Sequence, residues 1–225
     1  VGDPEKEQEL FQYTTAFPVT AAMAQTWNTE LLYQMGTAIY REMKEYGCTY
    51  WLAPAVNIHR NPLCGRNFEY FSEDPYLAGE MAASFINGVQ SKNVGTSIKH
   101  FAANNQEHRR MSSSSNVDER TLREIYFPAF ETSVKKAQPW TVMCSYNRIN
   151  GTPASASVYL LDTLLRKTFG FQGYVTSDCG AIKNMVDDHK WVPEGWDHSI
   201  NYEEAVMFGE VAGCDMDCGA VYPQN

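Results

Sequence analysis

Short apolar runs alternate with amphipathic stretches along most of this chain, and that alternation constrains the possible folds more than any other feature. Runs short enough to be buried strands occupy residues 49–57, 96–100, 141–146 and 173–177, and a shorter one follows at 215–216. Stretches with helical spacing of apolar residues separate them. Because strands that alternate with helices of ten or more residues build βαβ units, the pattern predicts an α/β fold with a parallel sheet.

The helical stretches carry recognisable stripes and end signals. The first stripe consists of Trp27, Leu31, Met35, Ile39 and Met43, which recur every four residues before Gly47. Further helices are expected over residues 75–89, 119–131, 157–165 and 203–212, with Asp74-Pro75 as a helix start. We expect Pro128 to kink its helix, and the serines at 112–115 to form a loop.

About five strand–helix units fit into 225 residues. A closed eightfold barrel typically needs about 250 residues. The pattern therefore indicates either an incomplete barrel or an open doubly wound sheet, and alternation alone does not decide between them.

The charge balance excludes several kinds of partner. Eighteen Lys and Arg stand against 27 Asp and Glu, so the net charge is −9 and the pI is near 5.0. An acidic chain has no electrostatic attraction to nucleic acid or to an anionic membrane, so we expect neither as a partner. The apolar runs are also far shorter than the roughly 18 residues of a spanning helix.

Six cysteines are too few for a disulfide scaffold in a chain of this length. Cys214 and Cys218 are four residues apart, but no histidine pair with zinc-finger spacing follows them. We therefore expect buried thiols and no metal site. The cellular compartment stays open.

Three of the apolar runs end in polar or titratable residues. The first ends in Lys99 and His100, the second in Tyr146 and Asn147, and the third in Ser177 and Asp178. Since sites in parallel α/β folds are built at the carboxyl ends of the strands, these endings favour a functional site.

Each of these residues also has a structural alternative. Asp178 is a candidate nucleophile or general base, or else a helix N-cap. Lys99 and His100 suit a hydroxylated ligand, or else form a salt bridge and a buried core histidine. Arg66 offers a planar fork for vicinal hydroxyls, or else pairs with Glu69 or Asp74. The amide-rich run 104–107 matches sugar hydroxyls, or else is a solvated turn. The remaining histidines have no metal spacing and are expected to be structural or exposed; they are His59, His108, His189 and His198.

Other common active-site motifs are missing from the sequence. It contains no G-x-G-x-x-G after a strand, no P-loop and no G-x-S-x-G nucleophile elbow. A dinucleotide site, a phosphate-cradling loop and a serine-hydrolase site are therefore unsupported.

Long ordered segments resemble glycoside hydrolase family 3, the β-glucosidase and β-xylosidase family. They read NIHRNPLCGRNFEYFSEDPYLAG at 57–79, IKHFAANNQEHRR at 98–110, DERTLREIYFPAFE at 118–131, VMCSYNRING at 142–151 and FGFQGYVTSDCGAI at 169–182. AFPVTAAMAQTWN at 16–28 and AGCDMDCG at 212–219 extend the similarity to nearly the whole chain.

The resemblance implies a role for individual residues. Asp178 occupies the position of the family's catalytic nucleophile. The positions that bind or line the sugar match Arg66, Lys99, His100, Arg110, Met143 and Tyr146. The resemblance implies no metal and no cofactor.

The resemblance also implies an incomplete (β/α)8 TIM-type barrel, with residues 1–225 as one partial N-terminal barrel domain. The family's first barrel loop, with an Asp that binds the terminal sugar, has no counterpart here. Nor does the following α/β sandwich domain, which usually carries the general acid/base. We therefore expect the missing barrel segment and the sandwich domain of the same protein as partners, and the 225 residues alone to be inactive.

Departures from the family pattern bear on the substrate. Cys179 stands where many β-glucosidases have Trp, and it resembles the β-xylosidase branch, as does the 217–219 stretch. Residues 68–77 and 99–107, by contrast, resemble the β-glucosidase branch. Cys64 stands where the family usually has Gly. Phe101 is followed by two alanines, which argues against N-acetylglucosaminide hydrolysis.

The resemblance thus predicts a retaining β-glycosidase that acts on oligosaccharides or glycosides. It would remove terminal β-D-glucosyl residues as the first choice and terminal β-D-xylosyl residues as the second. A covalent glycosyl-enzyme would form on Asp178, which Lys99 and Arg66 would help to keep ionised. Two alternatives remain: a sugar-binding chain without turnover, because the acid/base is missing, and a metal-dependent barrel hydrolase.

Overall fold

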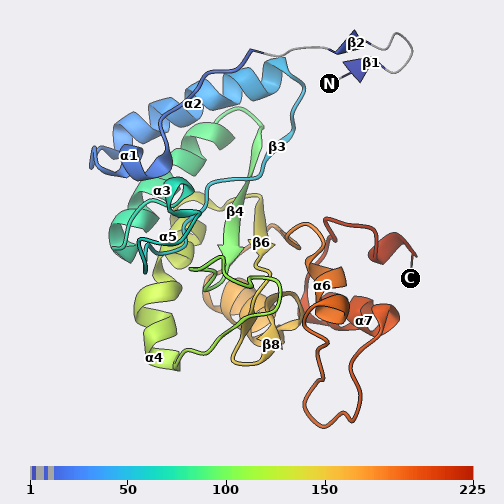
Figure 1. Ribbon diagram of the computed structural model, residues 1–225. Helices are drawn as coiled ribbons and strands as arrows, with labels where there is room; N and C mark the ends of the chain where they lie inside the picture. The colour runs from blue at the N-terminus through green and yellow to red at the C-terminus, as the bar shows by residue number, and fades with distance from the viewer. Residues whose placement is uncertain (1, 4–7, 10–12, 225) are drawn as a thin grey trace.

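A four-stranded parallel sheet forms the centre of the molecule (Figure 1). The structure is a computed structural model that describes residues 2–3, 8–9 and 13–224. The strand order is β3 (Tyr50–Trp51), β4 (Gly95–Phe101), β6 (Thr141–Cys144) and β9 (Tyr174–Thr176), and every neighbouring pair is parallel. This confirms the parallel α/β sheet predicted from the alternation.

Only part of the run at residues 49–57 is a regular strand. Regular pairing with β4 ends at Trp51, and Pro54 interrupts the run because proline has no N–H to donate to a ladder. An isolated bridge between Ala55 and Lys99 continues the alignment. Another bridge joins Thr176 to Met216, where the sequence predicts a short strand.

Helices flank the sheet, with α2, α3 and α5 on one side of it in Figure 1 and α6 and α7 on the other. The α-helices are α1 (Thr20–Ala24), α2 (Thr29–Glu45), α3 (Pro75–Gln90), α4 (Glu119–Thr121), α5 (Pro128–Ala137), α6 (Ala181–Asp187) and α7 (Tyr202–Ala212). Two segments are π-helical, namely η2 (Leu122–Tyr126) and η4 (Tyr159–Thr168). Short 3₁₀ turns are η1 (Asn67–Glu69), η3 (Ala154–Ala156) and η5 (Tyr222–Gln224).

The end signals read from the sequence place the helix starts well. The Asp74 side chain accepts a hydrogen bond from the Tyr76 N–H, and Pro75 is the first residue of α3. Pro128 opens α5 after the π-helical η2, so it separates two helical segments where the sequence predicts a kink.

The predicted stripe of the first helix is partly wrong. Trp27 precedes α2 and is 74% exposed, whereas Leu32, Ile39 and Met43 are buried. A step of four residues overshoots the 3.6-residue turn, so the start of a long i, i+4 series drifts off the buried face.

Two glycines bring the backbones of α2 and α3 together. A Cβ on Gly36 would lie 2.5 Å from the carbonyl oxygen of Phe85, and one on Gly88 would lie 2.2 Å from that of Tyr33. Both distances are below van der Waals contact, so the helices can approach this closely only because neither position has a side chain.

Four aromatic rings fill the core where β4 meets the helices behind it. The Phe101 ring lies 5.1 Å from that of Phe130, 5.9 Å from Phe127 and 6.3 Å from Phe169. All four side chains are buried, so the end of β4 is held against α5 and η4 by apolar packing.

Two smaller sheets lie outside the central one. β5 (Ser114–Ser115) pairs in parallel with β7 (Arg148–Ile149), which pairs antiparallel with β8 (Thr152–Pro153). The loop predicted at 112–115 is therefore wrong for its last two residues. β1 (Gly2–Asp3) and β2 (Gln8–Glu9) form an antiparallel pair near the N-terminus.

One disulfide links Cys179, which follows β9, to Cys218. The expectation of buried thiols is therefore wrong for this pair, and it is wrong for Cys48, which is exposed. It is confirmed for Cys64, Cys144 and Cys214. Residue spacing failed to predict the pairing because 39 positions separate the two cysteines.

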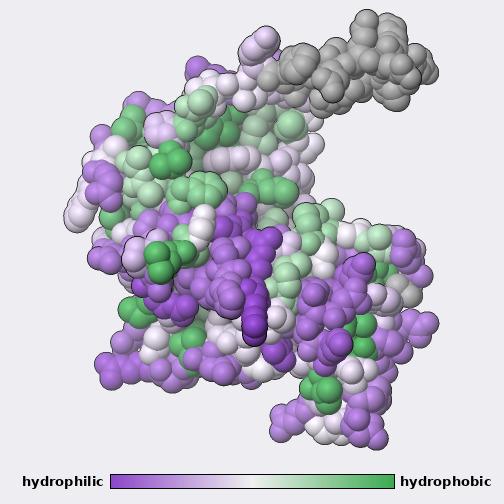
Figure 2. Space-filling view, viewed as in Figure 1, coloured by the Kyte–Doolittle hydropathy of each residue, from purple (hydrophilic) through white to green (hydrophobic). Residues whose placement is uncertain are grey.

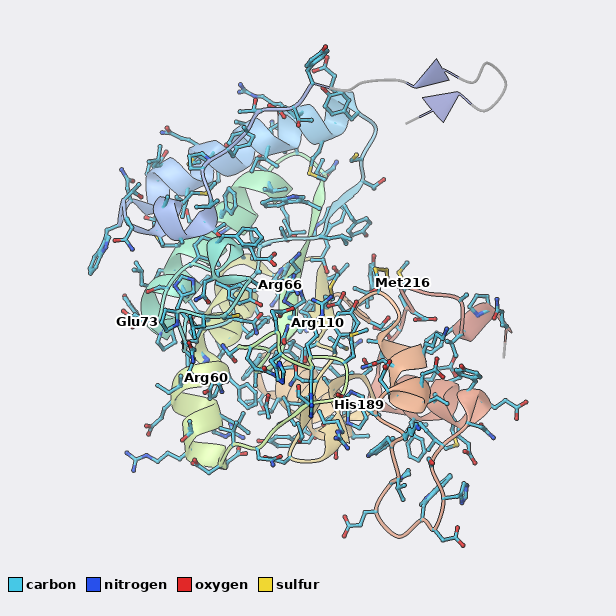
Figure 3. The ribbon with its side chains drawn as sticks, viewed as in Figure 1. Arg60, Arg66, Glu73, Arg110, His189 and Met216 are labelled. Atoms are coloured by element: carbon cyan, nitrogen blue, oxygen red, sulfur yellow. A yellow bond between two sulfur atoms is a disulfide. The ribbon has the colours of Figure 1, made fainter. Side chains whose placement is uncertain are left out.

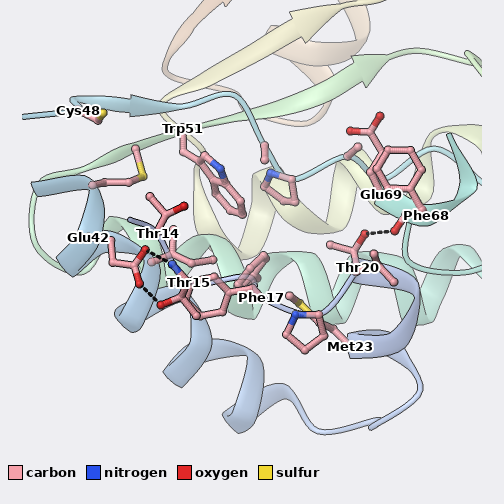
Figure 4. Close-up of a pocket in the computed structure, with 18 of the residues that line it drawn as sticks. Thr14, Thr15, Phe17, Thr20, Met23, Glu42, Cys48, Trp51, Phe68 and Glu69 are labelled. Carbon is pink, nitrogen blue, oxygen red and sulfur yellow. Dashed lines mark hydrogen bonds between the residues drawn. The ribbon is translucent and has the colours of Figure 1, made fainter. Parts of the chain in front are cut away.

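An apolar cavity of about 530 Å³ lies beside β3, lined by the 14–23 segment, the second half of α2, η1 and Phe85 of α3 (Figure 4). Phe17, Met23, Trp51 and Phe85 contribute to its lining, and Glu42 accepts hydrogen bonds from Thr15 at its rim. Within the described part of the chain, no helix has the length and apolar character needed to span a bilayer.

Candidate active site

The sequence-predicted site residues come from five segments that meet near the carboxyl ends of the central strands. Lys99 and His100 belong to β4, while Tyr146 and Asp178 follow β6 and β9. Figure 3 places Arg66 and Arg110 near the carboxyl ends of β4 and β6, and Figure 2 shows hydrophilic residues gathered over the same part of this face. The structure therefore brings the residues predicted from the strand ends together at one edge of the sheet.

Asp178 has two carboxylate oxygens in different surroundings. Its Oδ1 accepts a hydrogen bond of 2.8 Å from the Cys179 N–H. Its Oδ2 is buried and has no hydrogen-bond partner among the described residues, although it lies 3.7 Å from Nε2 of His100. Oδ1 is thus fixed by a hydrogen bond, whereas Oδ2 accepts no hydrogen bond from a described residue.

The alternative interpretation of Asp178 as a helix N-cap is wrong. The N-cap of α6 is Gly180, which has a left-handed backbone and makes no side-chain cap. The Asp178 carboxylate faces the site, and its backbone N–H donates to the carbonyl of Cys144.

His100 lies between Asn57 and Arg66. An Arg66 guanidinium N–H donates to its Nε2 over 2.9 Å, and its Nδ1 lies 3.2 Å from Oδ1 of Asn57. Because Arg66 can only donate, Nε2 carries no proton and Nδ1–H donates to Asn57. Burial lowers the pKa of His100 well below its usual range, and the charges of Arg66, Lys99 and Arg110 lower it further. The imidazole is therefore neutral.

Glu69 binds two of the candidate sugar-binding cations. Its Oε1 lies 2.5 Å from Nε of Arg66, and its Oε2 lies 3.3 Å from Nζ of Lys99. The Arg66–Glu69 pair was one of the structural alternatives, and it proves to be part of the same cluster of side chains as His100 and Asp178.

Arg110 lies over Tyr146 on the other side of the site. Its guanidinium carbon is 4.8 Å from the centre of the Tyr146 ring, and it donates to Glu107 over 3.0 Å. The Tyr146 hydroxyl donates to the carbonyl of Cys179. Burial raises the pKa of Tyr146 to about 12, so this hydroxyl keeps its proton at neutral pH.

Burial raises the pKa of Asp178 above its ordinary value. The Cys179 N–H, the charge of Arg66, the nearby Tyr146 hydroxyl and the charge of Arg110 act in the opposite direction without cancelling that effect. The expectation that Arg66 lowers this pKa is confirmed, but burial outweighs its effect, and Lys99 pairs with Glu69 instead.

Three other residues that the sequence singled out are also buried. Met143 lies inside β6, 3% exposed, opposite Thr176 of β9. Asn104 and Asn105 are buried too, and Asn105 donates to the carbonyl of Ile58, so this part of the amide run is not a solvated turn.

The four histidines outside the site hold structural or exposed positions, as predicted. Nε2 of His189 lies 2.8 Å from the carbonyl of Tyr146, and Nε2 of His59 lies 2.8 Å from that of Asn67. His108 and His198 are exposed. In the ranges 2–3, 8–9 and 13–224, no three His, Cys, Asp or Glu side chains gather in a way that suits a metal ion.

Two residues at the candidate site were not predicted from the sequence. Asn57 is 2% exposed and accepts from the His100 N–H over 2.8 Å. It ends the apolar run at residues 49–57, so the strand-end rule applied to that run would have found it. Cys218 has no comparable signal in the sequence.

Comparison with known proteins identifies the family. The model of the glycosyl hydrolase family 3 N terminal domain matches residues 5–221. Thermostable beta-glucosidase B of Acetivibrio thermocellus is 55% identical over 172 residues, which are 76% of this chain and 23% of that protein. An exo-alpha-(1->6)-L-arabinopyranosidase of Bifidobacterium breve is 56% identical over 167 residues, which are 74% of this chain and 22% of that protein.

Solved structures agree with this assignment. Beta-glucosidase 3B of Thermotoga neapolitana in complex with glucose has a TM-score of 0.81 at 49% identity, covering 98% of this chain and 28% of that one. A GH3 exo-beta-xylosidase in complex with a xylobiose aziridine probe has a TM-score of 0.89 at 30% identity, covering 96% and 29%. The chain spans about a quarter of the length of these relatives, and it belongs to glycosyl hydrolase family 3 as part of the family's N-terminal domain.

Proposed function

We propose that this chain supplies the nucleophile and most of the sugar-binding side chains of a retaining β-glycosidase. The observation that carries the proposal is the free Oδ2 of Asp178, buried beside the cationic side chains Arg66 and Arg110 and the neutral His100. A carboxylate oxygen that accepts no hydrogen bond keeps its lone pairs for the anomeric carbon of a bound sugar.

The reaction has two steps of the kind used by retaining enzymes. Oδ2 of Asp178 forms a bond to the anomeric carbon, the bond to the leaving oxygen breaks, and an acid gives that oxygen a proton. Water then attacks the same carbon and loses a proton to the conjugate base of that acid, and the Asp178 carboxylate leaves. Two carboxyl groups about 5–5.5 Å apart serve this chemistry.

The side chains around Asp178 are suited to sugar hydroxyls. Arg66, Lys99 and Arg110 donate hydrogen bonds, and a charged donor gives a stronger bond than a neutral one. The bare Nε2 of neutral His100 accepts from Arg66 in this structure, so a hydroxyl that binds it would donate its proton there in place of Arg66. Met143 and Tyr146 would line the pocket, with the Arg110–Tyr146 stack as one wall.

We further propose that residues 1–225 are part of a (β/α)8 barrel domain in a longer protein, and that another segment provides the acid/base. This proposal is supported by the small part of each relative, about a quarter of its length, that the chain matches. In the described sheet β3 pairs on one side only, and an apolar cavity lies next to it. Two carboxylates of the candidate site, Glu69 and Glu107, are both held in ion pairs with arginines.

The proposed substrates are terminal β-D-glucosides first and β-D-xylosides second. Xylopyranose differs from glucopyranose only by lacking the hydroxymethyl group, and the names of the relatives include both activities and an L-arabinopyranosidase. The relatives of higher sequence identity include a β-glucosidase, which favours glucose as the first choice.

A second candidate is a sugar-binding chain without turnover, because both Glu69 and Glu107 are engaged by cations. A panel of aryl β-glycosides separates the two candidates. We expect the full-length protein to hydrolyse them and the mass-verified 225-residue chain to bind glucose without releasing aglycone. Turnover by the short chain would instead assign the acid to one of its own carboxylates.

A further inference from the structure

Glu69 is placed to control where two cations of the site point. It is the last residue of η1, whereas Arg66 precedes η1 and Lys99 belongs to β4, so one carboxylate connects two separate segments. Each of its oxygens is used, with Oε1 2.5 Å from Nε of Arg66 and Oε2 3.3 Å from Nζ of Lys99. The three side chains are 21%, 18% and 16% exposed, so the cluster is shielded but still open to the site.

The cluster continues beyond Glu69 as a chain of hydrogen bonds. Arg66 uses Nε for Glu69 and a terminal nitrogen for Nε2 of His100, and His100 uses Nδ1 for Asn57. Asn57 also accepts from the backbone N–H of His100 and donates to its carbonyl, so that end is held firmly. At the opposite end, where the flexible side chains of Arg66 and Lys99 lie, the carboxylate of Glu69 is the only acidic partner among the described residues.

Asp178 is the competing partner for these cations. Its Oδ2 is buried, accepts no hydrogen bond among the described residues, and lies 3.7 Å from the nitrogen of His100 that Arg66 contacts. A guanidinium released from Glu69 would find this oxygen within a short side-chain movement, and the ion pair would occupy the lone pairs that a nucleophile needs.

We propose that Glu69 is a positioning residue that holds Arg66 and Lys99 toward the sugar and away from Oδ2 of Asp178. The inference rests on the proposed function, since it assigns Asp178 the covalent step. This role assigns Glu69 no contact with the sugar or with the reacting atoms.

The charge arithmetic gives this role a specific signature. The groups that face Asp178 are His100 from β4, Arg66 from before η1, Arg110 from the 102–113 segment and Tyr146 from after β6. Neutralising Glu69 removes one negative charge and frees the positive charge of Arg66 to act on Asp178. Both effects lower the pKa of Asp178, so its ionised form extends to lower pH.

The test compares Glu69→Gln, Glu69→Asp and Glu73→Gln in the full-length protein, with an aryl β-glucoside over a range of pH. Glu73 is exposed and lies well apart from Arg66 in Figure 3, which makes it the matched control. We expect Glu69→Gln to lower kcat/KM about 10- to 100-fold, as loss of a charge-assisted hydrogen bond does. We also expect the acidic limb of its kcat/KM–pH profile to move to lower pH, while Glu73→Gln keeps the wild-type profile.

Glu69→Asp retains the charge but is too short to reach both cations, so it should lose about tenfold in kcat/KM, and the acidic limb of its pH profile should move less than that of Glu69→Gln. It also serves as the test if Glu69→Gln does not fold, and activity within threefold of wild type would then overturn the proposal. For a folded Glu69→Gln, activity within threefold of wild type, or a large loss with an unmoved limb, would likewise overturn it.

A crystal structure of the Glu69→Gln protein gives an answer that does not depend on activity. We expect Arg66 to leave Nε2 of His100 and turn toward Asp178. If Arg66 and Lys99 stay where they are, the proposal is wrong even though the glycosidase assignment stands. Failure of the proposed function has another signature, since a wild-type protein without activity or without a covalent label on Asp178 would refute that function directly.

Discussion

Oδ2 of Asp178 lies 3.7 Å from Nε2 of His100, yet the two groups do not form an ion pair. Burial and three neighbouring cations keep the imidazole neutral, and Nε2 accepts a hydrogen bond from the Arg66 guanidinium. Asp178 therefore gains no counter-charge from the nearest side chain nitrogen. The ionised form of Asp178 is stabilised by the Cys179 N–H on its other oxygen, by the nearby Tyr146 hydroxyl and by the charges of Arg66 and Arg110.

The Asp178→Asn variant tests the covalent step. Asparagine keeps the shape of the side chain but lacks the charge and the attacking oxygen, so we expect kcat to fall about 10³-fold or more, equivalent to about 4 kcal/mol. Glucose binding should persist because the hydroxyl-binding residues are unchanged. Trapping the wild-type intermediate with a 2-deoxy-2-fluoro glycoside should label the peptide that contains Asp178. A label on another residue, or a variant within tenfold of wild type, would remove Asp178 from the mechanism.

The same variant should be more stable than wild type at neutral pH. The folded-state pKa of Asp178 is raised, so folding disfavours the charged form, and the contribution of this group to stability falls as pH rises from its ordinary value, about 3.9, through the raised one. Asparagine removes that penalty. We expect a higher unfolding midpoint for Asp178→Asn than for wild type at pH 7, and equal midpoints near pH 3, by calorimetry. A variant less stable than wild type at pH 7 would contradict the assigned direction.

The Cys179–Cys218 disulfide should stabilise the segment that carries Asp178. It closes a loop of 39 positions, and loop-closure entropy gives about 4 kcal/mol for a loop of that length. Replacing both cysteines with serine should lower the urea midpoint accordingly. Cys48→Ser is the control, because Cys48 is a free and exposed cysteine. Equal midpoints for the double variant and the control would show that the bond adds no stability.

Substrate preference is measured by kcat/KM for matched aryl glycosides with the full-length protein. We expect β-D-glucoside to exceed β-D-xyloside at least tenfold, because a pocket that hydrogen-bonds the hydroxymethyl group rejects the sugar that lacks it. An α-L-arabinopyranoside should be included, since a relative carries that name. A higher value for the xyloside would reverse the order, and would fit a pocket wall built by Cys179 in place of a large aromatic ring.

The sequence predicted the parallel sheet because strands and helices depend on local patterns. Asp74-Pro75 placed the start of α3, and the polar ends of the apolar runs singled out Lys99, His100 and Asp178, which the structure brings together as a candidate site. The net pKa direction of Asp178 and the Cys179–Cys218 bond depend on what folding brings together, so no local pattern contains them. The double engagement of Glu69 is of the same kind, because Lys99 is 30 positions away along the chain and reaches it only through the approach of η1 to β4.

The glycine contact between α2 and α3 has a consequence for protein engineering. Replacing helical glycines with alanine is a common route to heat-resistant enzymes, because alanine reduces the freedom of the unfolded chain. At Gly36 and Gly88 the added methyl group would meet a carbonyl of the facing helix at 2.5 and 2.2 Å, so the helices would have to separate. A thermostabilisation programme for this protein should leave both positions untouched and seek its gains on exposed helix faces.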